Sequence, residues 1–262
     1  MRMQTGCLCV SLLAMTAAQA GVVVHMARKN SPTDQPKDHE VVYVQDGLLR
    51  IDELDAQGHV QDLTLFRDGT IWKVDVQKHT FQKFDKNAMA AQQNGMKDKM
   101  QAMMQNMPPQ QRALLEERMK AMQQKSSDST VTDAGRSEHV GSYTCEIWQM
   151  SSNSSKLVSE YCVASKGSLP GGDELVNASH KAAAVAADVV AAAPQIAKAM
   201  PPIYTVYGKV EGFPVLVRHM VGGKPSSEET VTAIQRQSLP ADKFEIPKGF
   251  TEIKLGAAGA GD

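Results

Sequence analysis

Residues 62–84 read DLTLFRDGTIWKVDVQKHTFQKF, and this stretch decides the class of fold. Two runs rich in β-branched and aromatic residues flank Asp68-Gly69, and residues of these types favour β-strands. An Asp-Gly pair supplies the positive φ angles that a two-residue hairpin turn requires. The stretch therefore predicts antiparallel strands joined by a tight turn.

Further β-rich runs lie on both sides of this stretch. Turn residues separate them, including Asp46-Gly47 and Gly222-Gly223. The runs cover residues 22–26, 41–54, 140–150, 156–164 and 203–239, the last of which reads as three strands. Short strands at this spacing predict an antiparallel meander of roughly ten strands in two groups.

A helical insertion separates the two groups of strands. β-branched residues are absent from residues 86–124, where Met, Ala, Gln, Lys and Glu dominate, and all of these are good helix formers. Pro108-Pro109 divides the segment, because proline ends one helix and suits the first turn of the next. The segment predicts two helices that meet at this pair, followed by a polar loop over 125–137.

Another helix is predicted near residues 175–200, and Pro201-Pro202 ends it. Small apolar residues recur there at three- and four-residue steps and form one face of the helix. This face comprises Leu175, Ser179, Ala182, Ala186, Val189, Ala193, Ile196 and Met200.

Both groups of strands are predicted to belong to one domain, over residues 21–255. Either group alone would be a sheet with an uncovered apolar face. We therefore expect an α+β fold, in which helices cover the concave side of a strongly curved antiparallel sheet, an open and incomplete β-barrel. The glycine- and alanine-rich tail over 256–262 is predicted to be disordered.

The first twenty residues read as a secretory signal. Arg2 gives a positive start, an apolar stretch of twelve residues follows, and Ala18 to Ala20 (AQA) precede Gly21. The apolar stretch is too short to span a bilayer. We expect cleavage after Ala20 and a periplasmic protein without a lipid-modified N-terminus, since the next residue is glycine. No later segment reads as a transmembrane anchor.

Cleavage leaves two of the four cysteines, Cys145 and Cys162. An even pair in an exported protein favours a disulfide. The alternatives are two buried free thiols or a redox pair, and the absence of C-x-x-C spacing argues against redox chemistry. Both cysteines lie in strands on either side of a polar turn, so we expect a structural bridge across a hairpin.

No catalytic apparatus is visible in the sequence. The seven histidines stand at positions 25, 39, 59, 79, 139, 180 and 219, too far apart in sequence for a local metal-ligand pair. The G-x-S-x-G, H-E-x-x-H and phosphate-loop motifs are absent. A net charge of −1 provides no electrostatic footprint for nucleic acid. We expect neither an enzyme nor a cofactor, metal or nucleic-acid partner.

The helical insertion carries a stripe of methionines. Met96, Met100, Met103 and Met107 recur at helical spacing, and Leu115, Met119 and Met122 repeat it after the prolines. Such a stripe is compatible with core packing, with copper(I) binding by soft thioethers, or with an adaptable binding surface. Against copper, no histidine or cysteine occurs in residues 80–138. These seven residues are the candidate lid of a ligand-binding site.

The chain resembles known bacterial families. The strand–Asp-Gly–strand pattern with Trp72 and Asp75 resembles the periplasmic lipoprotein-carrier (Lol) fold. Residues 25–254 are similar to an exported family called domain of unknown function 4412. The shared motifs are YVQDGLLRID, MPPQQRALLEERM, GSYTCEIW, YCVA and FEIPKGF. The resemblance implies an open barrel with helices over its mouth and no established activity.

A second, shorter likeness concerns the helical insertion. MPPQQRALLEERMKAM is similar to the L-T-x-x-Q helices of periplasmic stress chaperones, but it occurs once and Met107-Pro108 replace Leu-Thr. We expect a non-enzymatic exported protein that shelters an apolar small molecule, a lipid or a lipidated segment in the open barrel. The alternative is a periplasmic chaperone that holds unfolded segments on the methionine-rich helices. Copper(I) sequestration is a third hypothesis.

Overall fold

The structure is a computed structural model that describes residues 20–31, 33–105, 107–108, 110–115, 117, 129–151 and 156–254. The strands are β1 (Gly21–Lys29), β2 (Lys37–Gln45), β3 (Leu48–Leu54), β4 (Val60–Arg67), β5 (Thr70–Asp75), β6 (Thr80–Phe84), β7 (Thr130–Val140), β8 (Tyr143–Ser151), β9 (Leu157–Ser165), β10 (Gly212–Val221), β11 (Lys224–Gln237) and β12 (Thr251–Glu252). The α-helices are α1 (Lys86–Gln105), α3 (Gly172–Ala192) and α4 (Ile203–Tyr207).

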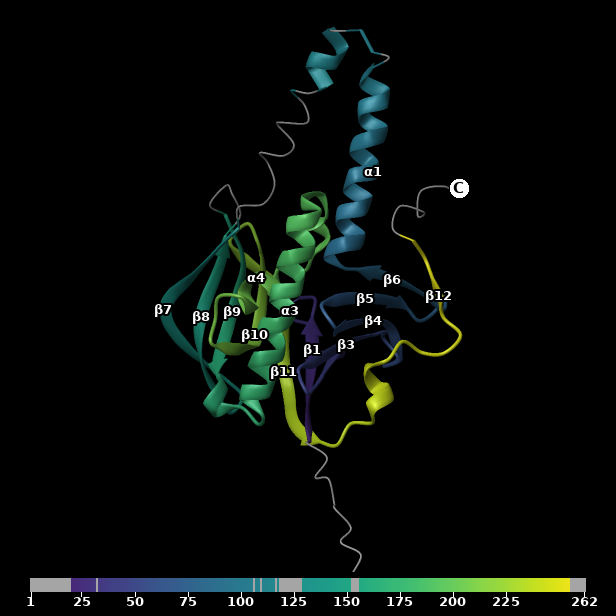
Figure 1. Ribbon diagram of the computed structural model, residues 1–262. Helices are drawn as coiled ribbons and strands as arrows, with labels where there is room; N and C mark the ends of the chain where they lie inside the picture. Colours follow the sequence, from purple (N-terminus) through teal and green to yellow (C-terminus); the bar gives the residue numbers. More distant parts are fainter. Residues whose placement is uncertain are drawn as a thin grey trace, which may run out of the picture.

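One open sheet contains all twelve strands of the described ranges. Its order is β12-β6-β5-β4-β3-β2-β1-β11-β10-β9-β8-β7 (Figure 1). Strand β1 pairs with β11 and thereby joins the two groups of strands into one sheet. Every pair is antiparallel except β12 with β6. The sheet curves but does not close, because β7 and β12 remain as edges, and the predicted open α+β fold is confirmed.

The predicted hairpin turns form as the sequence requires. Asp68 and Gly69 adopt φ angles of 52° and 69°, and Asp46 and Gly47 adopt 54° and 76°. Gly222 and Gly223 also have positive φ, at 61° and 78°. In each hairpin the residues directly before and after the turn are paired across the strands. These local turns set the register of the meander.

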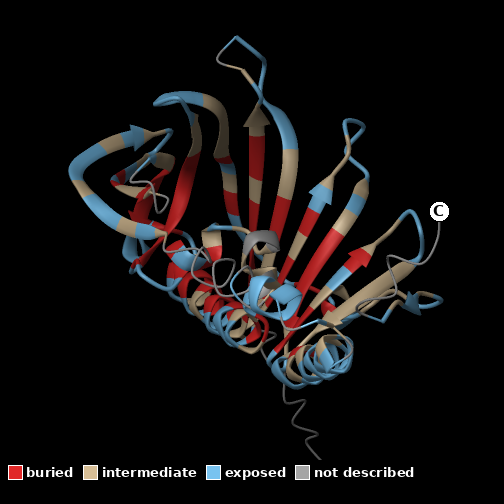
Figure 2. Ribbon diagram, turned by 90° about the horizontal axis from the view of Figure 1, so that it is seen from above, coloured by how far each residue is buried: buried red, intermediate tan, exposed pale blue. Residues whose placement is uncertain are grey.

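Helix α3 packs on the concave side of the sheet. Leu175, Ser179, Ala182, Ala186, Val189 and Ala193 are at most 4% exposed, which confirms this part of the predicted face. The helix is shorter than predicted, because α3 ends at Ala192 and a 3₁₀ helix begins at Pro194, so Ile196 and Met200 lie beyond it and are only partly buried. Ser179 satisfies its hydroxyl by donating to the Leu175 carbonyl at 2.9 Å. Figure 2 shows that the buried segments of the strands gather next to the helices. The core therefore lies between α3 and the centre of the sheet.

The outer face of the sheet is covered by the C-terminal segment. Val23 and Val41 alternate with residues that face α3, and they pack instead with Leu239 and Phe244. The Arg50 guanidinium donates to the Lys243 carbonyl at 2.9 Å and fixes the segment in place. Cover on both faces explains why β1 opens with three consecutive valines rather than an alternating pattern.

The polar loop predicted over 125–137 is in part a strand, because β7 begins at Thr130. This strand forms the edge of the sheet, and most of its side chains are exposed. Its pairing with β8 shifts between Asp133 and Ser137, and Gly135 within this bulge has a φ of 67°. An exposed, bulged edge strand lacks the apolar alternation by which strands are recognised in a sequence.

Residues 203–239 contain two strands rather than the predicted three. The first β-rich run, Ile203–Tyr207, forms helix α4. Its β-branched and aromatic residues favour a strand, but Tyr204 and Tyr207 are buried in the core on successive turns of this helix. Tertiary packing has overridden local propensity here.

Predictions about the ends of the chain concern residues outside the described part. The signal over 1–20 lies there except for Ala20, as does the tail over 256–262. Within the described residues, no helix is long and apolar enough to cross a membrane.

Candidate functional site

Helix α1 is anchored at its first turn. Asp85 precedes the helix, and its carboxylate accepts a hydrogen bond from the Ala88 amide at 2.8 Å, as an N-cap does. This bond, together with Lys83 at 2.9 Å, lowers the pKa of Asp85. One turn later Met89 is completely buried in the main core. The foot of the helix is therefore fixed to the sheet and to α3.

The upper part of α1 leaves the body of the protein (Figure 1). Met96 is 49% exposed and Met103 is 54% exposed, so neither is a core residue. Met100 and Met107 are partly buried. Among the methionines of α1, only Met89, which precedes the predicted stripe, packs in the core. A simple core role for the stripe is excluded by the exposure of Met96 and Met103.

A turn after α1 reverses the direction of the chain. The helix ends at Gln105, and residues 110–115 are helical again, so the predicted break at Pro108 is confirmed. The Arg112 guanidinium donates to the Met104 carbonyl at 3.1 Å and to the Met107 carbonyl at 3.4 Å. Unpaired carbonyls at a helix C-terminus are satisfied in this way by a basic side chain.

The second half of the candidate lid is only partly described. Leu115 is partly buried, and its neighbour Leu114 is 63% exposed. Met119 and Met122 lie outside the described residues. The structure thus places five of the seven candidate residues, Met96, Met100, Met103, Met107 and Leu115, on one projecting hairpin. They do not cover the concave face, which α3 covers instead.

The interior of the half-barrel is filled by side chains. Phe66 and Tyr204 make an edge-to-face contact with ring centroids 5.2 Å apart. Tyr207 stacks on Phe213 at 5.8 Å and approaches Tyr204 at 6.3 Å. Burial raises the pKa of both tyrosines well above the usual value, so they stay protonated. These rings and α3 occupy the space in which the sequence predicted an apolar ligand.

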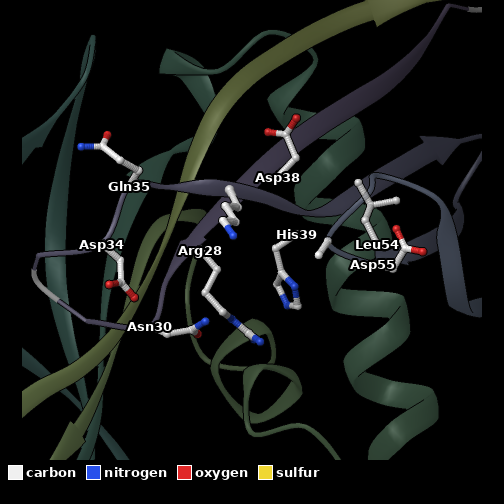
Figure 3. Close-up of a pocket in the computed structure, with 10 residues that line it drawn as sticks. Arg28, Asn30, Asp34, Gln35, Asp38, His39, Leu54 and Asp55 are labelled. Carbon is white, nitrogen blue, oxygen red and sulfur yellow. The ribbon is translucent and has the colours of Figure 1, made fainter.

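A pocket of about 460 Å³ lies where β1 and β3 end and β2 begins (Figure 3). Most of the residues that line it are polar or charged. The lining residues are Arg28, Asn30, Asp34, Gln35, Lys37, Asp38, His39, Leu54, Asp55 and Ala56. Burial, and then the charge of Arg28, lower the pKa of His39. A second pocket of about 310 Å³ at the foot of α1 is also lined mainly by polar residues. Charged side chains line both pockets, which disfavours a purely apolar ligand there.

A row of ionisable residues crosses the sheet beside the first pocket. Glu40 on β2 stands directly opposite Glu53 on β3, and Arg28 on β1 stands opposite Glu229 on β11. Arg28 donates to the Glu229 carboxylate through two nitrogens, with Nε at 3.0 Å, and His219 lies 3.5 Å away. Burial opposes ionisation of Glu229, but these partners outweigh it and hold its pKa at about 2.

The pKa of Glu40 is shifted in the opposite direction. Burial, followed by the charges of Glu229 and Glu53, raises its pKa to about 8, and Arg28 only partly compensates. In the described part of the chain its carboxyl has no hydrogen-bond or ion-pair partner. The sequence offered no signal for this residue, because the strand pairing that brings Glu53 and Glu229 close is not local.

The structure contains the predicted disulfide between Cys145 and Cys162. Cys145 pairs with Ala164 across β8 and β9, and Cys162 pairs with Ile147, so the bridge joins diagonal positions of the hairpin. The two Cα atoms are 5.2 Å apart. Both cysteines lie in the main core. A buried bridge in this position is structural, as the sequence suggested.

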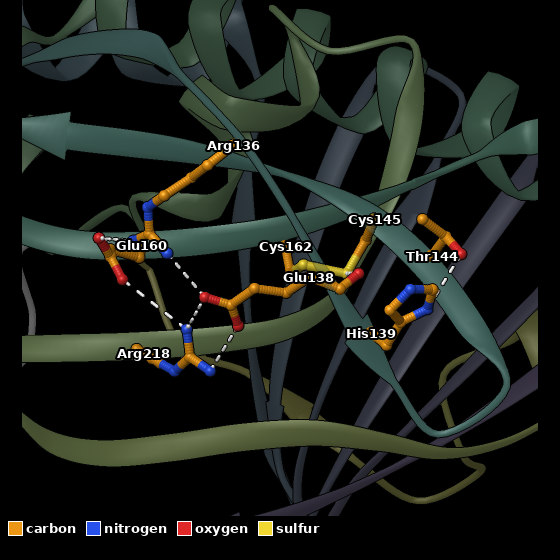
Figure 4. The surroundings of a disulfide bond; sticks show 8 residues. All are labelled: Arg136, Glu138, His139, Thr144, Cys145, Glu160, Cys162 and Arg218. Carbon is orange, nitrogen blue, oxygen red and sulfur yellow. Dashed lines mark hydrogen bonds and ion pairs between the residues drawn. A yellow bond between two sulfur atoms is a disulfide. The ribbon is translucent and has the colours of Figure 1, made fainter.

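A network of ion pairs lies next to the disulfide (Figure 4). Arg218 on β10 donates to Glu138 on β7 at 2.8 and 3.1 Å and to Glu228 on β11 at 3.0 Å. Arg136 bridges Glu138 at 2.7 Å and Glu160 at 2.6 Å. The hydrogen bond from Arg218 is the main reason that the pKa of Glu138 is lowered. The network ties the polar edge strand β7 to the sheet.

No described group of three or more His, Cys, Asp and Glu residues could hold a metal ion. The described part of the chain exposes apolar side chains on the projecting hairpin. Elsewhere, the Ser159 hydroxyl lies 3.4 Å from His219, whose other ring nitrogen lies 3.5 Å from Glu229.

A family model described as domain of unknown function (DUF4412) matches residues 46–250. The chain belongs to the DUF4412 family. None of the curated proteins with which it was compared matches this DUF4412 chain. Its structure is similar to an uncharacterised conserved protein from Thermus thermophilus, with 9% identity, a TM-score of 0.43 and 90% of each chain covered. It is also similar to a LolA superfamily protein from Nitrosomonas europaea, with 8% identity, a TM-score of 0.31, and 86% and 89% of the two chains covered.

Proposed function

We propose that this DUF4412 protein is an exported, non-enzymatic binding protein that captures an acyl chain or a lipidated segment on helix α1. The observation that carries the proposal is the exposure of Met96 and Met103 on the part of the helix that projects from the body. The filled interior and the two polar pockets support a surface site rather than a cavity. A buried disulfide supports an exported protein, because such bonds persist in oxidising compartments.

The chemistry of the stripe fits a flexible apolar ligand. Methionine has three rotatable bonds and a polarizable sulfur, so it adapts to partners of different shape. Completely burying a side chain of this size contributes about 1.5–3 kcal/mol. Met96 and Met103 are each about half exposed, so covering both should contribute about 2 kcal/mol to binding. Partly exposed neighbours on the stripe add to this value.

The chaperone hypothesis uses the same surface for a different partner. Leu114 is exposed near the turn of the hairpin and would extend an apolar surface for an unfolded polypeptide. We prefer the acyl chain, because a single narrow stripe on one helix matches a linear ligand. An unfolded polypeptide offers apolar groups at irregular spacing, which a broad surface would grip better.

A direct binding test uses the mature protein and a fluorescent, neutral acyl probe. Met96→Gln/Met103→Gln should weaken binding by about 30-fold, which corresponds to about 2 kcal/mol. Met96→Leu/Met103→Leu is the matched control, because it keeps volume and hydrophobicity. It should retain affinity for one well-fitting acyl chain and lose breadth across a panel of chains.

Three results would contradict the proposal. Equal binding by the glutamine variant and the parent would place the ligand elsewhere. Binding of a reduced and alkylated unfolded protein, with no binding of the acyl probe, would favour the chaperone. Stoichiometric copper(I) binding that the leucine variant loses would favour metal sequestration, because only the sulfur has been removed.

A further inference from the structure

We propose that the methionine stripe of α1 docks on an anionic lipid bilayer, with Lys97 and Lys99 on either side of it contacting the headgroups. This inference rests on the proposed function, and it names the source from which the acyl chains are taken. A protein that collects a lipid or a lipidated segment has to meet the bilayer that holds it.

The lysines flank the stripe. At 3.6 residues per turn, Lys97 lies about 100° from Met96 on one side of the helix and Lys99 about 60° on the other. Two further methionines lie between the lysines. Met103 is about 20° from Met96 towards Lys99, and Met104 is about 80° from Met96 towards Lys97. Asp98, the one acidic residue of α1, lies about 160° from Met96 on the opposite face.

The three charged side chains of this region lie at the surface of α1. The side chains of Lys97, Asp98 and Lys99 are all exposed, and none of them forms an ion pair within the described part of the chain. Long basic side chains beside an apolar stripe keep their charged ends at headgroup level while their stems cover apolar surface. The arrangement is that of a helix lying in a membrane interface.

The hairpin is also where exposed apolar residues concentrate. Four large hydrophobic side chains are markedly exposed in the described residues, and Met96, Met103 and Leu114 are three of them. The upper part of α1 and the helical residues 110–115 extend beyond the ends of the sheet (Figure 1). A flat surface can therefore reach this part of the protein without meeting the sheet.

A bilayer fits these features better than a soluble anion does. A free phosphate or sulfate would use the lysines but leave the methionines in water. A neutral acyl chain would cover the methionines but leave the lysines unused. An anionic bilayer satisfies both, and each lysine near such a surface should raise the affinity about fivefold at low salt. Docking of this kind is reversible.

The test is co-sedimentation of the mature protein with vesicles of phosphatidylcholine, with and without about one third phosphatidylglycerol. We expect binding to the anionic vesicles that weakens with added salt. Lys97→Gln/Lys99→Gln should reduce this binding about 25-fold. Lys209→Gln/Lys224→Gln is the matched control, because both side chains are exposed and the net charge changes equally. It should bind like the parent.

The neutral acyl probe separates the two proposals. Lys97→Gln/Lys99→Gln should bind this probe as the parent does, since the methionines remain. If the parent binds the probe but ignores anionic vesicles, membrane docking is wrong and the proposed function stands. An equal loss of vesicle binding in both lysine pairs would also overturn the docking site. If the parent binds neither the probe nor the vesicles, the proposed function itself fails.

Discussion

Changing Glu40 to glutamine should make the folded protein more stable at neutral pH. The Glu40 carboxyl stands opposite Glu53 without a hydrogen-bond partner among the described residues, and its pKa is raised from 4.5 to about 8, first by burial. Glutamine resembles the protonated side chain in shape and cannot ionise. The variant therefore removes the penalty for placing a titratable group at this position.

The dependence on pH follows from the two pKa values. Below pH 4.5 the Glu40 carboxyl is protonated in both the folded and the unfolded state, so its ionisation does not reduce the free energy of unfolding. Between about pH 4.5 and 8 the unfolded state loses the proton while the folded state retains it, so the free energy of unfolding falls as the pH rises. Above about pH 8 the loss is complete.

The magnitude is set by the size of this shift. One pKa unit corresponds to about 1.4 kcal/mol, so the parent should lose at most about 3 kcal/mol between pH 4.5 and 7 and about 5 kcal/mol by pH 8. Part of the Glu40 side chain reaches solvent, which makes these values upper bounds. Glu40→Gln should recover most of the loss at pH 7 and flatten the slope.

Urea unfolding at pH 5, 7 and 8, with the disulfide intact, measures these changes. Glu146→Gln is the matched control, since Glu146 is an exposed glutamate on strand β8. It should leave the slope with pH unchanged. The reasoning is refuted if the parent is as stable at pH 8 as at pH 5, or if Glu40→Gln is no more stable than the control at pH 7.

Three further predictions concern other parts of the protein. The pKa of Glu229 is about 2 in the folded protein, below its ordinary value of 4.5. Its contribution of about 3 kcal/mol to the free energy of unfolding should therefore be present above pH 4.5 and disappear as the pH falls towards 2. Acid unfolding of Glu229→Gln should lack this loss. Replacing Cys145 and Cys162 by alanine should reduce the free energy of unfolding by about 2–5 kcal/mol, and thiol labelling of the oxidised, unfolded parent should find neither cysteine free. Mass spectrometry of exported protein should find a chain that begins at Gly21, and a retained Met1 would contradict the predicted signal.

Features set by neighbours in the sequence were predicted well. The Asp-Gly turns require positive φ angles at adjacent residues, and the buried face of α3 follows from spacing along one helix. The strand pairing of β1 with β11 and the placement of Glu40 near Glu229 join residues far apart in the chain, so no local pattern reveals them. Helix α4 shows the same limit, since Tyr204 and Tyr207 gain more from burial as a helix than from strand propensity.

The methionine stripe shows why a periodic pattern alone could not distinguish core from surface. Met89, Met96 and Met103 are spaced seven residues apart and share one face of α1, yet Met89 is completely buried and the other two are about half exposed. The exposure differs because α1 is longer than the part of the protein on which it packs. A helix of 20 residues is about 30 Å long, and only its lower part meets α3 and β6.

Met89→Leu would therefore test core packing, and Met96→Leu would test recognition of the acyl chain. In the core, leucine should change stability by less than about 1.5 kcal/mol, because its volume is similar. On the projecting part it should leave the free energy of unfolding unchanged and narrow the range of acyl chains that bind. If Met96→Leu measurably lowered the free energy of unfolding, the upper part of α1 would have to be packed against something, and both the exposed stripe and the function proposed for it would be wrong.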